Sequence, residues 1–129
     1  MTKTRRHRSS SPFEAQFGFC RALRIGDVVQ VAGTAPIGPD GKTLAPNDAA
    51  AQTRRCFEIA REALESLGAD LGHVIRTRMF LTHIDDWQAV GEVHGEFFRD
   101  VMPVATMVEV SRLIDPTWRV EIEVEALVR

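Results

Sequence analysis

With 129 residues, of which 44% are hydrophobic, the chain fits one domain with a substantial buried core. It has only two cysteines, Cys20 and Cys56, and neither belongs to a CxxC pair, which argues against a disulfide framework and a zinc site. This cysteine usage makes a reducing cytoplasm the expected location. Motifs for nucleotide binding and for GxSxG or HExxH hydrolases are absent, so we expect no metal and no cofactor.

Charge is distributed unevenly along the chain. Lys3, Arg5, Arg6 and Arg8 lie at its start, and the other 12 basic residues face 18 acidic ones, so the rest of the chain carries a formal charge of −6. A body of this sign is poorly suited to a phosphate backbone, so we expect no nucleic-acid partner. No apolar run of signal-peptide or membrane-spanning type is present, so we expect no membrane partner.

The basic, serine-rich start is expected to be disordered. Residues 1–12 bury too little apolar surface to order themselves, so we favour a solvated tail over an arm for nucleic acid or a membrane surface. The folded domain is then expected over residues 13–129.

The first predicted elements are two strands and a loop. Alternating apolar residues predict strands over 17–25 and 28–33, and Gly26-Asp27 supplies the hairpin turn between them. A loop rich in glycine and proline follows over residues 35–46.

A long helix is predicted over residues 48–67. Asn47 is its expected N-cap and Gly68 its stop. One face is charged, so the helix is expected to pack on the other face only. The apolar face consists of Cys56, Ile59, Ala60, Ala63, Leu64 and Leu67.

A strand over residues 74–82 and a helix from Asp85 or Asp86 to about residue 100 come next. The strand is expected to place Ile75, Thr77, Met79 and Leu81 on one face, and Arg76, Arg78 and Phe80 on the other. The helix is expected to bury Trp87, Val90, His94, Phe97 and Val101.

Two more strands, over residues 106–113 and 119–128, close the domain. In the last one Val120, Ile122 and Val124 alternate with Glu121, Glu123 and Glu125. A row of carboxylates must face water, cations or a polar cleft, because like charges on a sheet repel. We therefore interpret this strand as the place of a site or an interface. The structural alternative is that its glutamates pair with Arg76, Arg78, Arg112 or Arg119, with Arg76 and Arg78 as the first candidates.

The predicted order is ββαβαββ, an α+β fold in which two helices cover one face of a mixed sheet. The opposite face would still carry Phe80 and Met107 beside its charges. Because a single sheet layer is not a stable architecture, something has to cover that face.

Short sequence pieces recur in a fixed order and spacing over most of the chain. They are residues 31–36 (VAGTAP), Ala51-Gln52, Phe97-Phe98, Pro103, Val108-Glu109-Val110, Arg112-Leu113 and Glu121-Ile122-Glu123. With these pieces, residues 17–129 resemble the Rid/YjgF family, the reactive-intermediate imine deaminases that are also labelled endoribonuclease L-PSP. The resemblance implies a chorismate mutase-like fold and a homotrimer with a central barrel and small-molecule clefts between subunits.

The resemblance also implies a site, from which this chain departs. In active members the second residue after the proline is an arginine that holds the substrate carboxylate, and here it is Ala105, which cannot form those hydrogen bonds. Glu121 matches the glutamate that positions the attacking water. The substrate-binding set is completed by Gly33 and by four further substitutions: Phe19 for a tyrosine, Gly91 for an asparagine, Ala32 for a serine and Met107 for a cysteine.

We therefore expect a protein that binds a small molecule between subunits and lacks 2-imino acid deaminase activity. The alternative is an enamine or imine deaminase, or a related hydrolase, that uses Glu121 to position water. An Arg76, Arg78 or Arg112 side chain in the cleft would replace the missing arginine and favour this alternative. For Cys20 and His94, a nucleophilic pair is the less favoured interpretation, because nothing in the sequence places them together.

Overall fold

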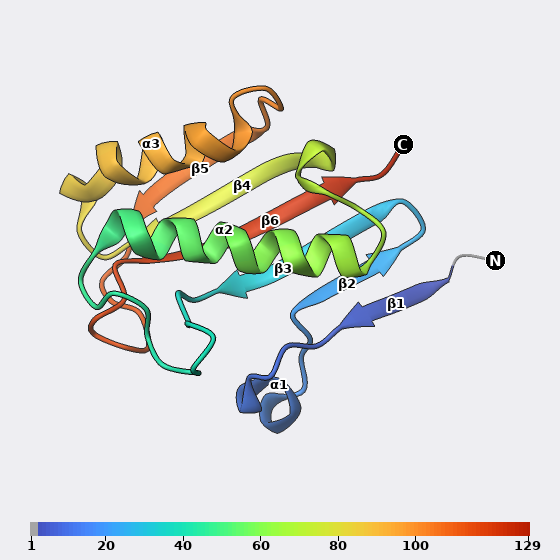
Figure 1. The fold of residues 1–129 in the computed structure, drawn as a ribbon, viewed down its shortest axis with the longest axis horizontal. Coiled ribbons are helices and arrows are strands. Elements are labelled where there is room, and N and C mark those ends of the chain that lie inside the picture. The colour runs from blue at the N-terminus through green and yellow to red at the C-terminus, as the bar shows by residue number, and fades with distance from the viewer. Residues whose placement is uncertain (1–2) are drawn as a thin grey trace.

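A mixed sheet organises the fold (Figure 1). The structure is a computed structural model, and it describes residues 3–129. Within these residues, six strands form one sheet in the order β1-β2-β3-β6-β4-β5. Only β4 and β5 run parallel to each other. The strands are β1 (Thr4–His7), β2 (Ala22–Ile25), β3 (Val28–Thr34), β4 (Val74–Leu81), β5 (Val104–Glu109) and β6 (Val120–Leu127).

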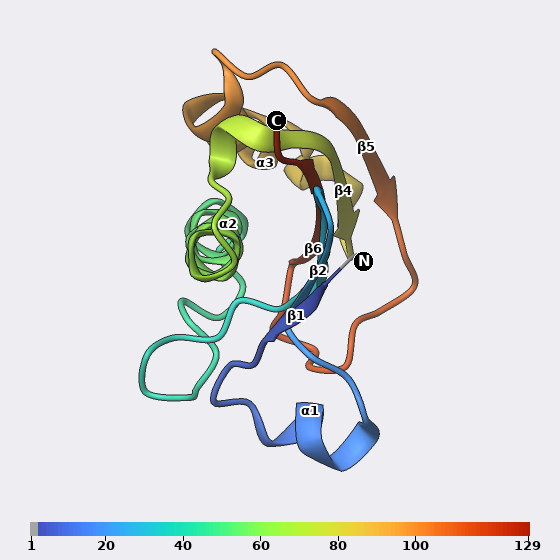
Figure 2. The same cartoon turned by 90° about the vertical axis from the view of Figure 1, so that its right-hand side faces the viewer.

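Helices α2 (Ala49–Ser66) and α3 (Trp87–Phe98) lie on the same side of this sheet, as Figure 2 shows most clearly for α2. A shorter helix, α1 (Pro12–Phe17), lies beyond the end of the sheet, and Leu71–His73 and Ile84–Asp86 are single 3₁₀ turns. The α+β class and the placement of two long helices on one face are confirmed. Among residues 3–129, no helix combines the length and the apolar character needed to cross a membrane.

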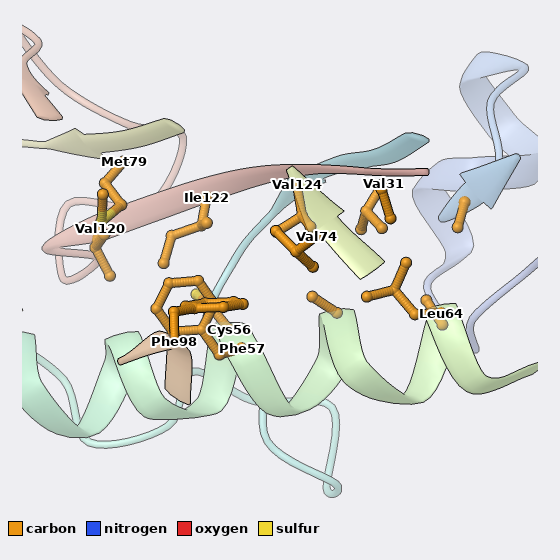
Figure 3. Packing of buried hydrophobic residues seen from close by; sticks show 14 of the residues in the cluster. Val31, Cys56, Phe57, Leu64, Val74, Met79, Phe98, Val120, Ile122 and Val124 are labelled. Atoms are coloured by element: carbon orange, nitrogen blue, oxygen red, sulfur yellow. The ribbon is translucent and has the colours of Figure 1, made fainter. Parts of the chain in front are cut away.

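The core lies between α2, α3 and the inner face of the sheet (Figure 3). Strand β6 shows the predicted alternation, since its even-numbered residues Val120, Ile122 and Val124 are buried while the glutamates between them are half-exposed. Phe57 of α2 and Phe98 of α3 meet edge to face, with ring centroids 5.0 Å apart. Burial of these side chains is the main term that holds the helices on the sheet.

The prediction of a disordered tail is wrong for the described part of residues 1–12; residues 1 and 2 lie outside it. Thr4–His7 forms β1, the edge strand paired antiparallel with β2. Arg5 Nη2 donates to the carbonyl oxygen of Leu67 at 3.1 Å, just past the end of α2. Arg24 Nη1 donates to the same oxygen at 2.7 Å. Cations at a helix C-terminus bind carbonyls that have no partner within the helix and interact favourably with the helix dipole. Composition could not predict the contact of Arg5 with this distant segment, and it therefore indicated disorder where the structure has a strand.

The serines of the same segment organise α1. Ser11 caps its N-terminus by accepting from the Phe13 N–H at 3.4 Å. Ser9 binds the carboxylate of Glu14 through both its backbone N–H, at 3.0 Å, and its hydroxyl. Serine enrichment here therefore supplies helix caps and hydrogen bonds, which are as typical of serine as disorder is.

Several predicted boundaries also need correction. The first predicted strand begins at Ala22 and not at residue 17, because α1 occupies the start of that range and ends at Gly18 with a left-handed φ of 75°. Asp48, not Asn47, caps α2, and its side chain accepts from the Ala51 N–H at 3.0 Å. The strand predicted over residues 106–113 is β5, which begins earlier, at Val104, and ends earlier, at Glu109.

Two residues expected in the core are exposed instead. The β4–β6 register shifts between Val74 and Arg76, so Val74 takes the inward position and Ile75 is exposed. Trp87 is the first residue of α3 and lies past the edge of the core, with an exposed side chain.

Candidate functional site

The face of the sheet opposite α2 and α3, here called the open face, carries the glutamate row. Within residues 3–129 no helix covers it (Figure 2). In the register, Glu121 lies beside Phe80, Glu123 beside Arg78 and Glu125 beside Arg76. The strand prediction that brought Arg76 and Arg78 towards the glutamates is thus correct in its geometry.

Two of the three glutamates have polar partners within the chain. Arg78 Nη1 lies 3.5 Å from Glu123 Oε1, and Gln30 Nε2 donates to Glu125. These half-exposed contacts support the structural interpretation of Glu123 and Glu125, since such pairs are common on ordinary surfaces and contribute about 0–1 kcal/mol.

Glu121 has a different environment. Burial raises the pKa of its carboxyl above the ordinary value, the nearby Arg21 charge works against that rise, and Glu123 adds to it. A Cβ atom on Gly33 would stand 2.5 Å from Glu121 Oε2, so the carboxylate uses the space that a glycine leaves at the end of β3. A half-buried carboxyl with a raised pKa can exchange a proton nearer neutral pH than a solvated one.

Arg21 is the site residue that sequence reasoning missed. Its side chain is largely buried, and Nη1 donates to the carbonyl oxygen of Gly33 at 2.6 Å and to Thr34 Oγ1 at 3.3 Å. Its Nε lies 3.5 Å from Glu14 Oε2, and its guanidinium lies 5.7 Å from the centre of the Phe19 ring. The one signal in the sequence that could have indicated its role is the position of this charged residue inside the mainly apolar strand predicted over residues 17–25.

The predicted site residues fall into two groups, and the first surrounds Arg21. Phe19 contacts its guanidinium, and Ala32 and Gly33 lie at the end of β3, where Gly33 adjoins Glu121. The backbone N–H of Ala32 also donates to the Arg21 carbonyl at 2.8 Å. We call Phe19, Ala32, Gly33 and Glu121 the glutamate flank.

The second group, Gly91, Ala105 and Met107, lies at β5 and α3, and we call it the alanine flank. Ala105 pairs in register with Thr77, whose hydroxyl is 2.8 Å from Nε2 of His94 in α3, so Ala105 lies on the helix-covered side. Met107 packs against the core on that same side. A Cβ on Gly91 would meet nothing within 4 Å inside the chain, which favours an open space over close helix packing.

One chain does not bring the two flanks together. Glu121 pairs with Phe80, and Phe80 pairs with Val108, so these three residues share the open face. Ala105 and Met107 alternate with Val108 along β5 and therefore belong to the opposite face. Glu121 and Ala105 are separated by the sheet itself.

The contacts of the remaining candidates, His94 and Cys56, support structural roles in the core. His94 bonds to Thr77 and packs against Phe57 and Phe98, and burial lowers its pKa; none of its contacts within residues 3–129 is with Cys20. The buried Cys56 thiol donates to the Thr34 carbonyl at 3.3 Å, and burial raises its pKa well above the ordinary value. Within the described residues, no three His, Cys, Asp or Glu side chains gather closely enough to hold a metal ion.

Comparison with known proteins identifies the family. The family model described as "Endoribonuclease L-PSP" matches residues 9–128, almost the whole chain. The chain belongs to this family, which is the Rid/YjgF family. The resemblance inferred from short motifs is thereby confirmed.

Relatives of this Rid/YjgF chain include proteins with and without an assigned activity. The uncharacterized protein SCO2049 of Streptomyces coelicolor is 43% identical over 122 residues, which cover 95% of this chain and 90% of that protein. The Rv2704 structure from Mycobacterium tuberculosis is 44% identical and superposes with a TM-score of 0.89, covering 98% and 100% of the two chains. The 3-aminoacrylate deaminase RutC of Acinetobacter baylyi is 31% identical, covering 78% and 79%.

Proposed function

We propose that this Rid/YjgF chain forms a homotrimer and binds a small molecule in the clefts between neighbouring subunits. The separation of the two flanks carries the proposal. The family resemblance assigns both flanks to one site, yet the sheet keeps Glu121 and Ala105 apart within a chain. They can meet only if the glutamate flank of one subunit faces the alanine flank of another.

The composition of the open face supports assembly. Apolar side chains with large exposed fractions, among them Ile25, Val28, Val104 and Val108, lie on it around the glutamate row. An apolar surface rimmed by charges is typical of a protein interface. The free cysteines Cys20 and Cys56 fit the cytoplasmic location that we infer.

We further propose that the cleft lacks 2-imino acid deaminase activity. Ala105 offers only a methyl group where a guanidinium would hold the substrate carboxylate. Neither Arg76 nor Arg78 shares a face with Ala105, and Arg78 already contacts Glu123. Arg112 is exposed beyond the end of β5. These positions give no support to a replacement arginine from the same subunit.

Hydrolysis of another small imine or enamine is the second candidate function, and the raised pKa of Glu121 favours it. The carboxylate would accept a proton from a water molecule as that water attacks the C=N carbon. It would return this proton to the nitrogen to give a carbinolamine. It would then carry the proton of the new hydroxyl group to the same nitrogen, so that the C–N bond breaks and a carbonyl compound and ammonia are released. An enamine would react in the same way once protonation at its carbon has formed the imine. The relative named 3-aminoacrylate deaminase supports this candidate without identifying the substrate.

Crosslinking tests the intersubunit cleft directly. In a Cys20→Ser background, which leaves only the buried Cys56 thiol, we would combine Ala32→Cys with Ala105→Cys and add a short bis-maleimide. We expect covalent dimers and trimers on a denaturing gel. The matched control pairs Asp40→Cys, in the exposed 38–41 turn, with Ala105→Cys and should stay monomeric. Equal crosslinking of both pairs, or of neither, would reject the cleft.

A further inference from the structure

A pocket lies beside α1, and the family resemblance assigns a role to only one of its lining residues, Phe19. The pocket has a volume of about 440 Å³ and is lined by residues of β1, α1 and the segment leading into β2. This volume lies within the range of small-molecule sites. The lining residues are Arg6, Arg8, Glu14, Ala15, Gly18, Phe19 and Cys20.

The charge in this pocket is unbalanced. Glu14 is almost fully buried, and its carboxylate already has Ser9 and Arg21 as partners. Arg6 and Arg8 are exposed, and neither forms an ion pair with a carboxylate of the described residues 3–129. Two free guanidinium groups therefore border a pocket whose one acid is neutralised.

The position of β1 in the sheet determines where these arginine side chains lie. Arg5 and Arg6 alternate along the strand, so Arg5 reaches the end of α2 while Arg6 projects to the opposite side of the sheet. The pairing of β1 with β2 thus places Arg6 in the strand, and Arg8 follows directly after its last residue, His7; both line the pocket together with the half-exposed ring of Phe19. A planar guanidinium can bind a carboxylate or phosphate through two parallel hydrogen bonds.

We propose that this pocket binds a small anion, with its carboxylate or phosphate group held by Arg6 and Arg8 and its apolar part against Phe19. The inference deepens the proposed function and rests on it in one respect, since Phe19 also belongs to the glutamate flank. It assigns the anion-binding role to the start of the chain, in place of the arginine that is missing at Ala105.

Calorimetric titration with matched probes tests the proposal. Benzoate and phenyl phosphate supply the two anionic groups, and benzamide is the neutral isostere of benzoate. We expect at least one anion to bind, and benzamide to bind about tenfold more weakly or not at all. A preference for benzoate would identify a carboxylate site, and a preference for phenyl phosphate would identify a phosphate site.

The variant Arg6→Gln combined with Arg8→Gln should weaken anion binding by about tenfold and leave benzamide unchanged. Lys3→Gln is the matched control, because it removes a nearby charge that does not line the pocket, and it should bind as the wild type does. Circular dichroism would check that the double variant keeps its fold, which Arg5 and the β1–β2 pairing should maintain.

Benzamide binding as tight as benzoate, or anion binding that survives the double substitution, would overturn the inference. The absence of binding by both anions at millimolar concentration would do the same. The oligomeric state, measured on the same samples, separates the two proposals. A trimer that fails these titrations loses only the anion pocket, whereas a monomer that passes them loses only the intersubunit cleft.

Discussion

The two faces of β6 differ in how completely residues of the same chain cover them. The inner face, with Val120, Ile122 and Val124, is sealed by α2 and α3 and has close-packed neighbours. The open face has half-exposed glutamates, one ion pair to Arg78, and a carboxyl at Glu121 whose pKa is raised. The inner face explains why the chain folds, and the open face carries the features that call for a partner or a ligand.

The largest expected effect is a contrast in stability between adjacent residues of β6. Ile122→Ala should lower the free energy of unfolding by about 2–5 kcal/mol, because it leaves a cavity in the core. Glu123→Ala removes a half-exposed ion pair that contributes about 0–1 kcal/mol within one chain, so it should cost less than Ile122→Ala. Urea unfolding at one protein concentration measures both values, and equal losses would contradict the distinction between the faces.

A second prediction concerns the alanine flank. Hydrolysis of 2-iminopropanoate and 2-iminobutanoate should be at least roughly a hundredfold slower than by relatives with the clamping arginine, because Ala105 makes no bond to the carboxylate. Ala105→Arg alone should not restore the full rate, since Phe19 lacks a hydroxyl and Gly91 an amide to support it. Ammonia release measures both rates. Full recovery would show that these supporting residues matter little.

The third prediction uses the raised pKa of Glu121. The folded-state pKa of this carboxyl lies above the ordinary value of 4.5. At a pH between 4.5 and the folded-state pKa, the folded chain therefore binds more protons than the unfolded chain. The free energy of unfolding falls as the pH rises through this range. Glu121→Gln should remove this loss, so the variant should gain stability over the wild type as pH rises. Urea unfolding over a pH series checks the sign. A wild type whose stability rises relative to the variant would contradict it.

The smallest expected effect is on RNA. The rest of the chain carries a formal charge of −6, so any RNA binding should depend on the basic start and weaken steeply with salt. Because β1 is part of the sheet, substituting Lys3, Arg6 and Arg8 by Gln is a cleaner test than deletion. Filter binding should lose its residual signal in this variant. RNA cleavage that persists there at physiological salt would favour the ribonuclease label.

Local patterns predicted the inner face well. Alternation in β6 and helical spacing in α2 depend on residues next to one another, so the sequence alone indicated their buried sides. The identity of the fold came from the order of short motifs along the chain. The shifted position of Val74 depends on a register irregularity between strands, which no local pattern encodes.

The polar environment of the candidate site was harder to predict from the sequence. Arg5 orders the start of the chain through Leu67, 62 residues away, and Arg21 is buried because Glu14, Gly33 and Thr34 surround it. Such contacts join distant segments and follow no period. The sequence therefore identified Glu121 as a candidate but could not supply the arginines near it.

The central claim is that the open face is completed by other copies of the chain, and the mass in solution tests it most directly. Light scattering at micromolar concentration should give three times the chain mass of 14.4 kDa. A monomer at that concentration would leave the two flanks apart and contradict the proposed cleft.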